Sequence, residues 1–103
     1  MKTSELTGAA LDWAVAKCEG VINGDDLDIG FILERGYTPS TDWAQGGPII
    51  ERELIELQYN GEWKATNQLL DYGSGTTPLV AAMRCYVASK LGDEVNVPDG
   101  VLP

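Results

Sequence analysis

The fold is decided by residues 54–66, which read Leu-Ile-Glu-Leu-Gln-Tyr-Asn-Gly-Glu-Trp-Lys-Ala-Thr. Polar and apolar residues alternate on both sides of Asn60-Gly61, and this alternation is typical of two antiparallel strands that each bury one face. An Asn-Gly pair tolerates the positive φ angles that a tight hairpin turn requires. The sequence therefore predicts a β-hairpin with strands at 54–59 and 62–66.

The register of this hairpin follows from the position of Trp63. A two-residue loop would place Trp63 on the face opposite Leu57 and would divide the apolar side chains between the two faces. A three-residue loop that ends at Gly61, left-handed in a bulge, gathers the apolar side chains on one face. We therefore predict the bulged register, in which Leu57 pairs with Trp63 and Ile55 pairs with Ala65.

The N-terminal part of the chain predicts a helix followed by a strand. Residues 4–18 carry apolar side chains at helical spacing, and Thr3 or Ser4 can cap the start of the helix. From residue 27 the apolar period changes to two, which indicates a strand at 27–33. Residues 21–22 are a candidate short partner for this strand across a turn at residues 23–24.

The C-terminal part predicts a second long helix. Thr77 caps it, Pro78 takes its first position, and Gly92 stands where it ends. The residues beyond it are rich in proline and aspartate, so we expect them to be extended and loosely attached. The predicted division is a single domain at 1–92 and an extended tail at 93–103.

A dense run of turn-forming residues precedes the hairpin, from Tyr37 to Pro48: Tyr-Thr-Pro-Ser-Thr-Asp-Trp-Ala-Gln-Gly-Gly-Pro. Ser40 or Thr41 can cap a short helical turn at 41–45. Pro48 lacks a backbone donor and clashes with the preceding turn of a helix. The segment therefore predicts a broken helix, with a second helical piece that begins near Pro48.

Together these elements predict one α+β domain. A chain of 103 residues is long enough to fold without disulfides or a structural metal. We expect a small antiparallel sheet of three to four strands around the central hairpin. The N-terminal and C-terminal helices and the short broken helix are expected to pack on this sheet.

Net charge and apolar content argue against two classes of function, nucleic-acid binding and membrane binding. Sixteen acidic and seven basic residues give a net charge of −9, which repels nucleic acid and anionic lipid. We therefore expect no direct nucleic-acid partner. No apolar run approaches the ~18 residues of a membrane span. The first residues do not resemble a signal peptide, so we expect a cytoplasmic protein that binds no membrane.

The chemistry of the side chains argues against an enzyme. The chain has no histidine, and Cys18 and Cys85 lie in separate helical patterns rather than in a Cys-x-x-Cys motif. The usual zinc sites and histidine-dependent nucleophiles cannot be assembled from these residues. We expect two free thiols, no catalytic residue, no metal and no cofactor.

Several segments carry a resemblance to a known family: Leu-Asp-Trp-Ala-Val-Ala at 11–16, residues 37–51, Thr-Pro-Leu at 77–79, and Ala-Met-Arg-Cys-Tyr-Val-Ala at 82–88. In these segments the chain resembles the NinX-type family of small bacteriophage and prophage proteins. More distantly, Pro-Ser-Thr-Asp at 39–42 is similar to a second group of phage proteins, which are described as alpha-beta-alpha sandwiches.

The resemblance implies a phage accessory protein that acts in the cytoplasm of the infected bacterium and has an alpha-beta-alpha sandwich-like fold. It implies no activity, substrate or catalytic residue. Genes of this kind commonly interfere with host machinery or host defence, which is an analogy drawn from genomic context.

Two candidate sites for an anionic ligand lie near the C-terminal helix. The first is the glycine-rich loop that enters this helix, because a helix N-terminus and glycine backbone favour an anion. Its alternative is a capped connecting loop. The second is Arg84, which lies on or beside an apolar stripe and needs a carboxylate, a phosphate or backbone carbonyls. Its alternative is an internal ion pair or a position at the edge of the stripe. The loop residues are Ser74, Gly75, Thr76 and Thr77.

The third candidate site is the run of turn-forming residues before the hairpin. It supplies aromatic surface and hydrogen-bonding groups on a loop, where binding residues are common. The alternative is a helix cap next to a core tryptophan. The residues concerned are Tyr37, Ser40, Thr41, Asp42, Trp43 and Gln45.

These observations leave three function classes open. In the first, the protein binds a small anionic molecule, such as a nucleotide-derived defence signal, in pockets shared between subunits of a homodimer or higher oligomer. In the second, it is an acidic inhibitor that covers a basic surface of a host protein and resembles DNA in its charge. In the third, it is a structural or assembly accessory. The glycine-threonine loop favours the first class, because net charge alone is less specific.

Overall fold

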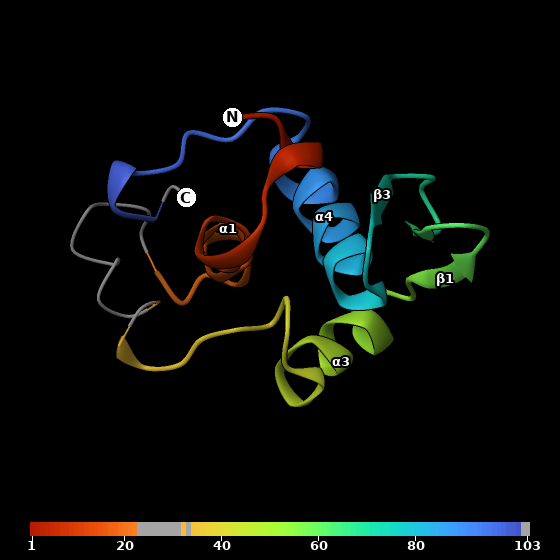
Figure 1. Cartoon of the computed structure of the whole chain (residues 1–103), viewed down its shortest axis with the longest axis horizontal. Coiled ribbons are helices and arrows are strands. Elements are labelled where there is room, and N and C mark those ends of the chain that lie inside the picture. The colour runs from red at the N-terminus through yellow and green to blue at the C-terminus, as the bar shows by residue number, and fades with distance from the viewer. Residues whose placement is uncertain (23–31, 33, 102–103) are drawn as a thin grey trace.

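The computed structural model describes residues 1–22, 32 and 34–101. This part of the chain contains three α-helices of ten or more residues and a three-stranded antiparallel sheet, which confirms the α+β fold (Figure 1). In chain order the elements are η1 (Thr3–Glu5), α1 (Gly8–Glu19), α3 (Trp43–Arg52), β1 (Glu56–Tyr59), β2 (Trp63–Thr66), β3 (Tyr72–Gly75), α4 (Pro78–Leu91) and η3 (Asp99–Val101).

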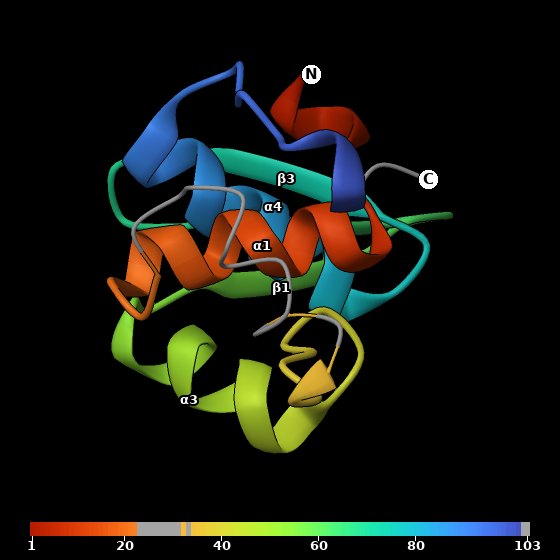
Figure 2. The ribbon, with the colours of Figure 1, turned by 90° about the vertical axis from the view of Figure 1, so that its left-hand side faces the viewer.

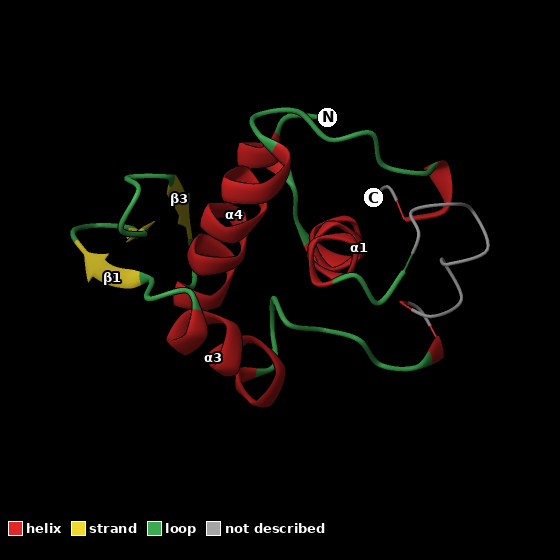
Figure 3. Ribbon diagram, turned by 180° about the vertical axis from the view of Figure 1, so that it is seen from behind, coloured by secondary structure: helices red, strands yellow, loops and turns green. Residues whose placement is uncertain are grey.

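Helix α4 occupies the centre of the molecule. It packs against β2 and β3 on one side and against α1 on the other (Figures 1 and 3). Helix α3 lies near the N-terminal end of α4. Viewed from the side in Figure 2, α1 lies in front of α4, and the strands lie behind both. The layers are therefore ordered sheet, α4 and α1, so the sheet is an outer layer.

The ends of α4 agree with the sequence prediction. The Thr77 hydroxyl accepts a hydrogen bond from the Val80 amide at 3.1 Å, and Pro78 is the first helical residue. Gly92 ends the helix with a φ of 82°. The helix is buried on most of its surface because it lies between two layers, and its buried residues are Leu79, Ala81, Ala82, Met83, Cys85, Tyr86 and Val87.

Strand β3 includes Ser74 and Gly75, which were predicted to belong to the loop that enters the C-terminal helix. Its two glycines face α4: a Cβ atom on Gly73 would overlap the backbone of Ala81 and Cys85, and one on Gly75 would lie 2.8 Å from Cγ1 of Val80. Only glycine permits this close approach of strand and helix. Gly-x-Gly here therefore reflects helix–sheet packing rather than a flexible loop.

The hairpin forms with a register that differs from the prediction by two residues. Leu57 pairs with Ala65 and Tyr59 pairs with Trp63, so the three-residue loop covers residues 60–62. The predicted pairs of Leu57 with Trp63 and Ile55 with Ala65 are wrong. A shift of two residues keeps every side chain on its face. The gathering of the apolar side chains on one face is therefore confirmed, and so is the left-handed Gly61, with a φ of 80°.

The first helix begins later than predicted. Residues 3–5 form only a 3-10 turn, and α1 starts at Gly8 after an extended Thr7. The carbonyl of Leu6 accepts a hydrogen bond from Arg84 instead of an intrahelical one. Gly20 ends the helix in the left-handed conformation, as helix C-caps commonly do.

Helix α3 is continuous, so the predicted break at Pro48 is wrong. The cap is also different, because the side chain of Asp42 accepts from the Ala44 amide, whereas Ser40 and Thr41 were expected to cap. Pro48 removes only one intrahelical donor. Gly47 before it has no Cβ atom to clash with the proline ring, which lowers the penalty for a helical residue at this position.

The C-terminal tail is attached to the N-terminal segment. Lys2 and Glu94 form an antiparallel bridge, and the Thr3 amide donates to the Asp93 carbonyl at 2.8 Å. Val95 and Val101 are buried in the core. Residues 93–101 are therefore bonded to the rest of the domain rather than loosely attached, and Asp99–Val101 form a 3-10 turn.

The strand expected at 27–33 and its turn at 23–24 lie outside the described residues except for Ile32, which is buried and has helical backbone. Among the described residues, no helix is long and apolar enough to span a bilayer. The two cysteines are free thiols, as predicted, with Cys85 buried and Cys18 partly buried.

Candidate functional site

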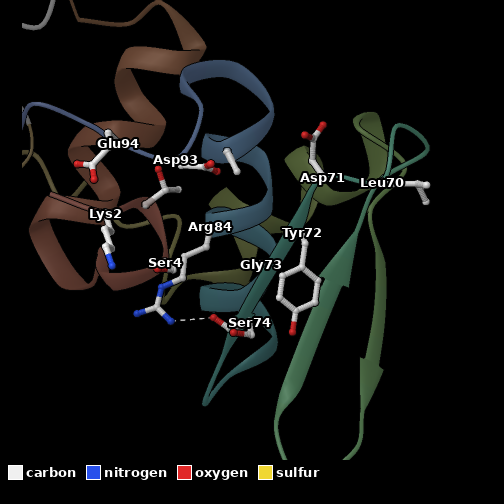
Figure 4. Close-up of a pocket in the computed structure, with 12 residues that line it drawn as sticks. Lys2, Ser4, Leu70, Asp71, Tyr72, Gly73, Ser74, Arg84, Asp93 and Glu94 are labelled. Atoms are coloured by element: carbon white, nitrogen blue, oxygen red, sulfur yellow. Dashed lines mark hydrogen bonds between the residues drawn. The ribbon is translucent and has the colours of Figure 1, made fainter.

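One pocket lies between the outer edge of β3, the middle of α4 and the two chain termini. It has a volume of about 470 Å³. One wall comes from residues 2–4, the opposite wall from residues 70–74, and the remainder from Arg84, Ala88, Asp93 and Glu94 (Figure 4). The bridge between the N-terminal segment and the tail therefore builds part of this pocket.

Arg84 is held in the wall of this pocket by backbone carbonyls. Its Nε donates to the Leu6 carbonyl at 2.8 Å and its Nη1 donates to the Ser74 carbonyl at 2.7 Å. Within the described residues, Arg84 forms no salt bridge and its Nη2 makes no hydrogen bond. Burial lowers the pKa of Arg84, yet a guanidinium stays protonated in proteins. The pocket thus holds a positive charge that no carboxylate neutralises directly.

Charges of both signs surround this guanidinium. In the view of Figure 4, the Lys2 ammonium and the Arg84 guanidinium point toward the same side of the pocket as Ser74, and the Tyr72 ring lies beyond Ser74. The carboxylates lie on the opposite side of the picture and belong to Asp71, Asp93 and Glu94. A ligand that fits this distribution has an anionic group at one end and hydroxyl or amino groups at the other.

Of the predicted loop residues, only Ser74 shares this pocket with Arg84. The start of α4 has few donors left for an anion, because Pro78 has no N–H and the amides of Val80 and Ala81 bond to Thr77. Leu79 at this position is buried. The geometry therefore favours Arg84 over the N-terminus of α4 as the candidate site for an anion.

A second pocket is lined by three predicted residues of the run before the hairpin and by Thr77 of the glycine-rich loop. It has a volume of about 360 Å³ and lies between the start of α3 and the start of α4. Trp43, which is 54% exposed, is its largest aromatic group. Its lining is mostly apolar and consists of Ser40, Thr41, Trp43, Thr77, Pro78, Leu79 and Val80. Of the predicted site residues, Ser74 and Arg84 line the first pocket, and four others line the second. The remaining predicted residues line neither pocket, and these are Tyr37, Asp42, Gln45, Gly75 and Thr76.

Comparison with known protein families identifies the chain. The family model described as Bacteriophage P22, NinX matches residues 2–90. The chain belongs to this phage NinX family. No curated protein matches it. The match covers both pockets except for the tail residues Asp93 and Glu94, and it confirms the resemblance seen in the sequence.

In this NinX-family chain, two residues of the run before the hairpin have structural roles. The Gln45 side chain donates to the Gly36 carbonyl and to Asp42 Oδ2, each at 2.9 Å, and accepts from the Thr38 amide at 2.9 Å. Asp42 caps α3. These bonds brace the loop, so the helix-cap alternative accounts for Asp42 and Gln45.

The neighbouring Ser40 is tied to the core. Its amide donates to Oδ1 of Asp12 at 2.9 Å, and both residues are buried. The Ser40 hydroxyl makes no hydrogen bond of good geometry in the described part of the chain. It still lies near enough to the Asp12 carboxylate to offset part of the effect that burial has on the pKa of Asp12. Tyr37 is half-buried beside this pair, and burial raises the pKa of Tyr37 to about 12.

A cluster of side chains around Arg52 was not predicted from the sequence. Arg52 pairs with Glu19 at 2.7 Å and with Glu53 at 2.8 Å, and its guanidinium lies 5.7 Å from the centre of the Tyr86 ring. The Tyr86 hydroxyl donates to Glu19 at 2.5 Å. The hydrogen bond from Arg52 lowers the pKa of Glu19. This cluster joins the ends of α1 and α3 to the middle of α4, which no local pattern could reveal.

Within the described residues, no group of three or more His, Cys, Asp or Glu side chains is arranged to hold a metal ion.

Proposed function

We propose that this protein is a non-enzymatic phage accessory protein that binds and sequesters a small anionic, nucleotide-derived molecule in the pocket around Arg84. The observation that carries the proposal is the guanidinium of Arg84, which two carbonyls hold in the pocket wall without a carboxylate partner among the described residues. The role against host defence is proposed by analogy with other phage accessory genes.

The physical argument concerns the charge of Arg84. A partly buried guanidinium that bonds only to carbonyls has lost hydration without gaining a counter-charge, and burial accordingly lowers its pKa. A phosphate in the pocket would supply that counter-charge through charge-assisted hydrogen bonds. The volume of about 470 Å³ falls in the range of small-molecule sites.

The remaining lining matches the other parts of a nucleotide. Tyr72, which is 50% exposed, offers a ring on which a base can stack. Asp93 and Glu94 offer acceptors for the hydroxyl groups of a sugar. Lys2 adds a second positive charge for a phosphate.

Calorimetric titration of the full chain with orthophosphate, pyrophosphate, AMP, ADP-ribose and a cyclic dinucleotide tests this proposal. We expect saturable binding of at least one nucleotide. Arg84→Gln should weaken it by about 10-fold to 100-fold, the value of one or two hydrogen bonds to a charged group. Arg52→Gln is the matched control, because Arg52 lies outside the pocket and should leave affinity unchanged.

Two results would contradict the proposal: absence of binding across the panel, or equal affinity of wild type and Arg84→Gln. Arg84→Lys separates charge from structure, because it keeps the positive charge and should retain part of the affinity. Thermal melting of each variant in the absence of ligand shows whether the fold persists.

A second candidate is an acidic inhibitor of a basic host protein. The net charge of −9 and the carboxylates of Asp71, Asp93 and Glu94 on one side of the pocket favour it. This alternative predicts that the nucleotide panel stays silent. It also predicts that affinity for a captured host protein falls steeply with ionic strength, and that Asp93→Asn with Glu94→Gln weakens binding.

A further inference from the structure

The connection between β2 and β3 presents two leucines to solvent. Leu69 is 84% exposed and Leu70 is 83% exposed, the highest values among the large hydrophobic residues that the structure describes. Single exposed leucines are common on protein surfaces and need no explanation. Two adjacent ones at the tip of a turn are less expected, because turns favour polar residues and glycine.

This turn has a defined conformation. Oδ1 of Asn67 accepts from the amides of Leu69 at 3.0 Å and Asp71 at 2.9 Å, and its Nδ2 donates to Oδ2 of Asp71 at 3.0 Å. The thiol of Cys85 in α4 donates to the Asp71 carbonyl at 3.3 Å. The two leucines are therefore displayed on a braced turn that is bonded to the central helix.

The backbone of Leu70 is unfavourable for its side chain. Its φ is 66°, a left-handed conformation that glycine or asparagine adopts with less strain than leucine. Burial does not explain the choice, because the side chain is exposed. A leucine that is strained, exposed and held in one place suits a contact with another molecule, since the turn is ordered before binding and loses little entropy.

The surface beside the leucines has charges of both signs. Leu70 and Tyr72 form one lip of the pocket that also contains Lys2 and Arg84 on one side and carboxylates on the other. A basic partner would meet the two cations here, and an acidic partner would meet the carboxylates. A second copy related by a two-fold axis places the cations of each subunit opposite the carboxylates of the other, which makes the surface self-complementary.

We propose that Leu69, Leu70 and Tyr72 form the contact through which a second copy of this chain docks around a two-fold axis. The apolar side chains of the two copies pack together at the centre of the interface, and the pocket beside them is closed by the partner. The contact requires no ligand, so it stands or falls independently of nucleotide binding.

Sedimentation equilibrium of the full chain in phosphate-free buffer tests this interface. We expect wild type to form dimers, and Leu69→Ser and Leu70→Asn each to raise the dimer dissociation constant at least tenfold. Leu54→Asn is the matched control, because Leu54 is also exposed (56%) and left-handed (φ 54°) but lies at the end of α3. It should leave the dissociation constant unchanged.

The Leu70→Asn variant also separates association from folding. Asparagine relieves the left-handed strain, so this variant should melt at or above the wild-type temperature when both are diluted to monomers. A wild type that stays monomeric at millimolar concentration contradicts the proposal, whether or not it binds vesicles or a foreign protein. A dimer that Leu70→Asn leaves intact, or that Leu54→Asn weakens equally, contradicts it as well.

Discussion

Asp12 is a buried carboxyl group whose only direct hydrogen bond of good geometry in the described chain comes from the Ser40 amide. Burial raises the pKa of Asp12, and the contacts with Ser40 offset part of this effect. The folded state therefore binds a proton at Asp12 more readily than the unfolded state does. Protonation of Asp12 therefore contributes to the stability of the folded state. This contribution is fully present below the pKa of Asp12 in the unfolded state and is lost as pH rises through its pKa in the folded state.

Replacement of Asp12 by Asn and by Ala separates charge from hydrogen bonding. Asn keeps an acceptor for the Ser40 amide and removes the desolvated charge, so it should be at least as stable as wild type at neutral pH. Ala leaves the amide buried without a partner and should lower the free energy of unfolding by about 1–3 kcal/mol.

Urea denaturation between about pH 4 and pH 7 measures both effects for Asp12. The Asn variant should lack the part of the pH dependence that wild type loses as pH rises. An Asn variant as unstable as the Ala variant would show that the carboxylate itself is required.

At the scale of elements, the approach of β3 to α4 depends on glycine. A Cβ atom on Gly73 would overlap the backbone of Ala81 and Cys85, which cannot move aside as a flexible side chain can. Strand β3 also presents the Ser74 carbonyl to Arg84. The distance between strand and helix therefore sets the geometry of the candidate site.

Gly73→Ala should force the strand away from the helix. We expect a loss of about 1–3 kcal/mol in the free energy of unfolding, as for overpacked cores, and weaker ligand binding. Gly47→Ala in α3 is the control: apart from its two chain neighbours and the backbone of its own helix, the nearest atom to its Cβ would be a carbon of Trp43 at 3.9 Å. There the gain in helix propensity is opposed by the following Pro48, so the net change should be small.

Chemical denaturation of the two glycine variants gives their relative stability. Equal effects of Gly73→Ala and Gly47→Ala would contradict the packing argument.

At the scale of the whole molecule, the two chain ends form one wall of the candidate site. The amino group of Met1 donates to the Val95 carbonyl at 2.9 Å, and the Val95 amide donates to the Met1 carbonyl at 2.9 Å. The buried Val95 side chain anchors this contact in the core. Asp93 and Glu94 reach the pocket only because the tail is anchored in this way.

Val95→Ala should weaken the anchor. Loss of two buried carbon atoms corresponds to about 1–2 kcal/mol. The amides of Thr3 and Val95 should exchange with solvent faster, while amides in the middle of α4 change less. Hydrogen exchange followed by NMR measures this difference. Asn96→Ala, at an exposed neighbour, is the control, and uniform acceleration throughout the chain would indicate global rather than local loosening.

The features that depend on local chemistry could be predicted from the amino-acid sequence. Helix α4 begins at Thr77 and Pro78 and ends at Gly92 because a cap, a proline and a glycine with positive φ act on the backbone next to them. The alternation of the hairpin decided which side chains share a face, because a side chain's face depends on the parity of its position. Arg84 was a candidate because a charge beside an apolar stripe needs partners.

Tertiary structure alone decided what depends on distant neighbours. Gly73 and Gly75 indicate a loop until α4 lies against them, and the hairpin register shifted by two residues without changing either face. The Arg84 guanidinium could have bonded to a carboxylate, a phosphate or backbone carbonyls. It bonds to the carbonyls of Leu6 and Ser74, because the packing of the elements brings these two residues within reach. Contacts between residues far apart in sequence are set by the packing of whole elements, which local propensity and periodicity do not encode.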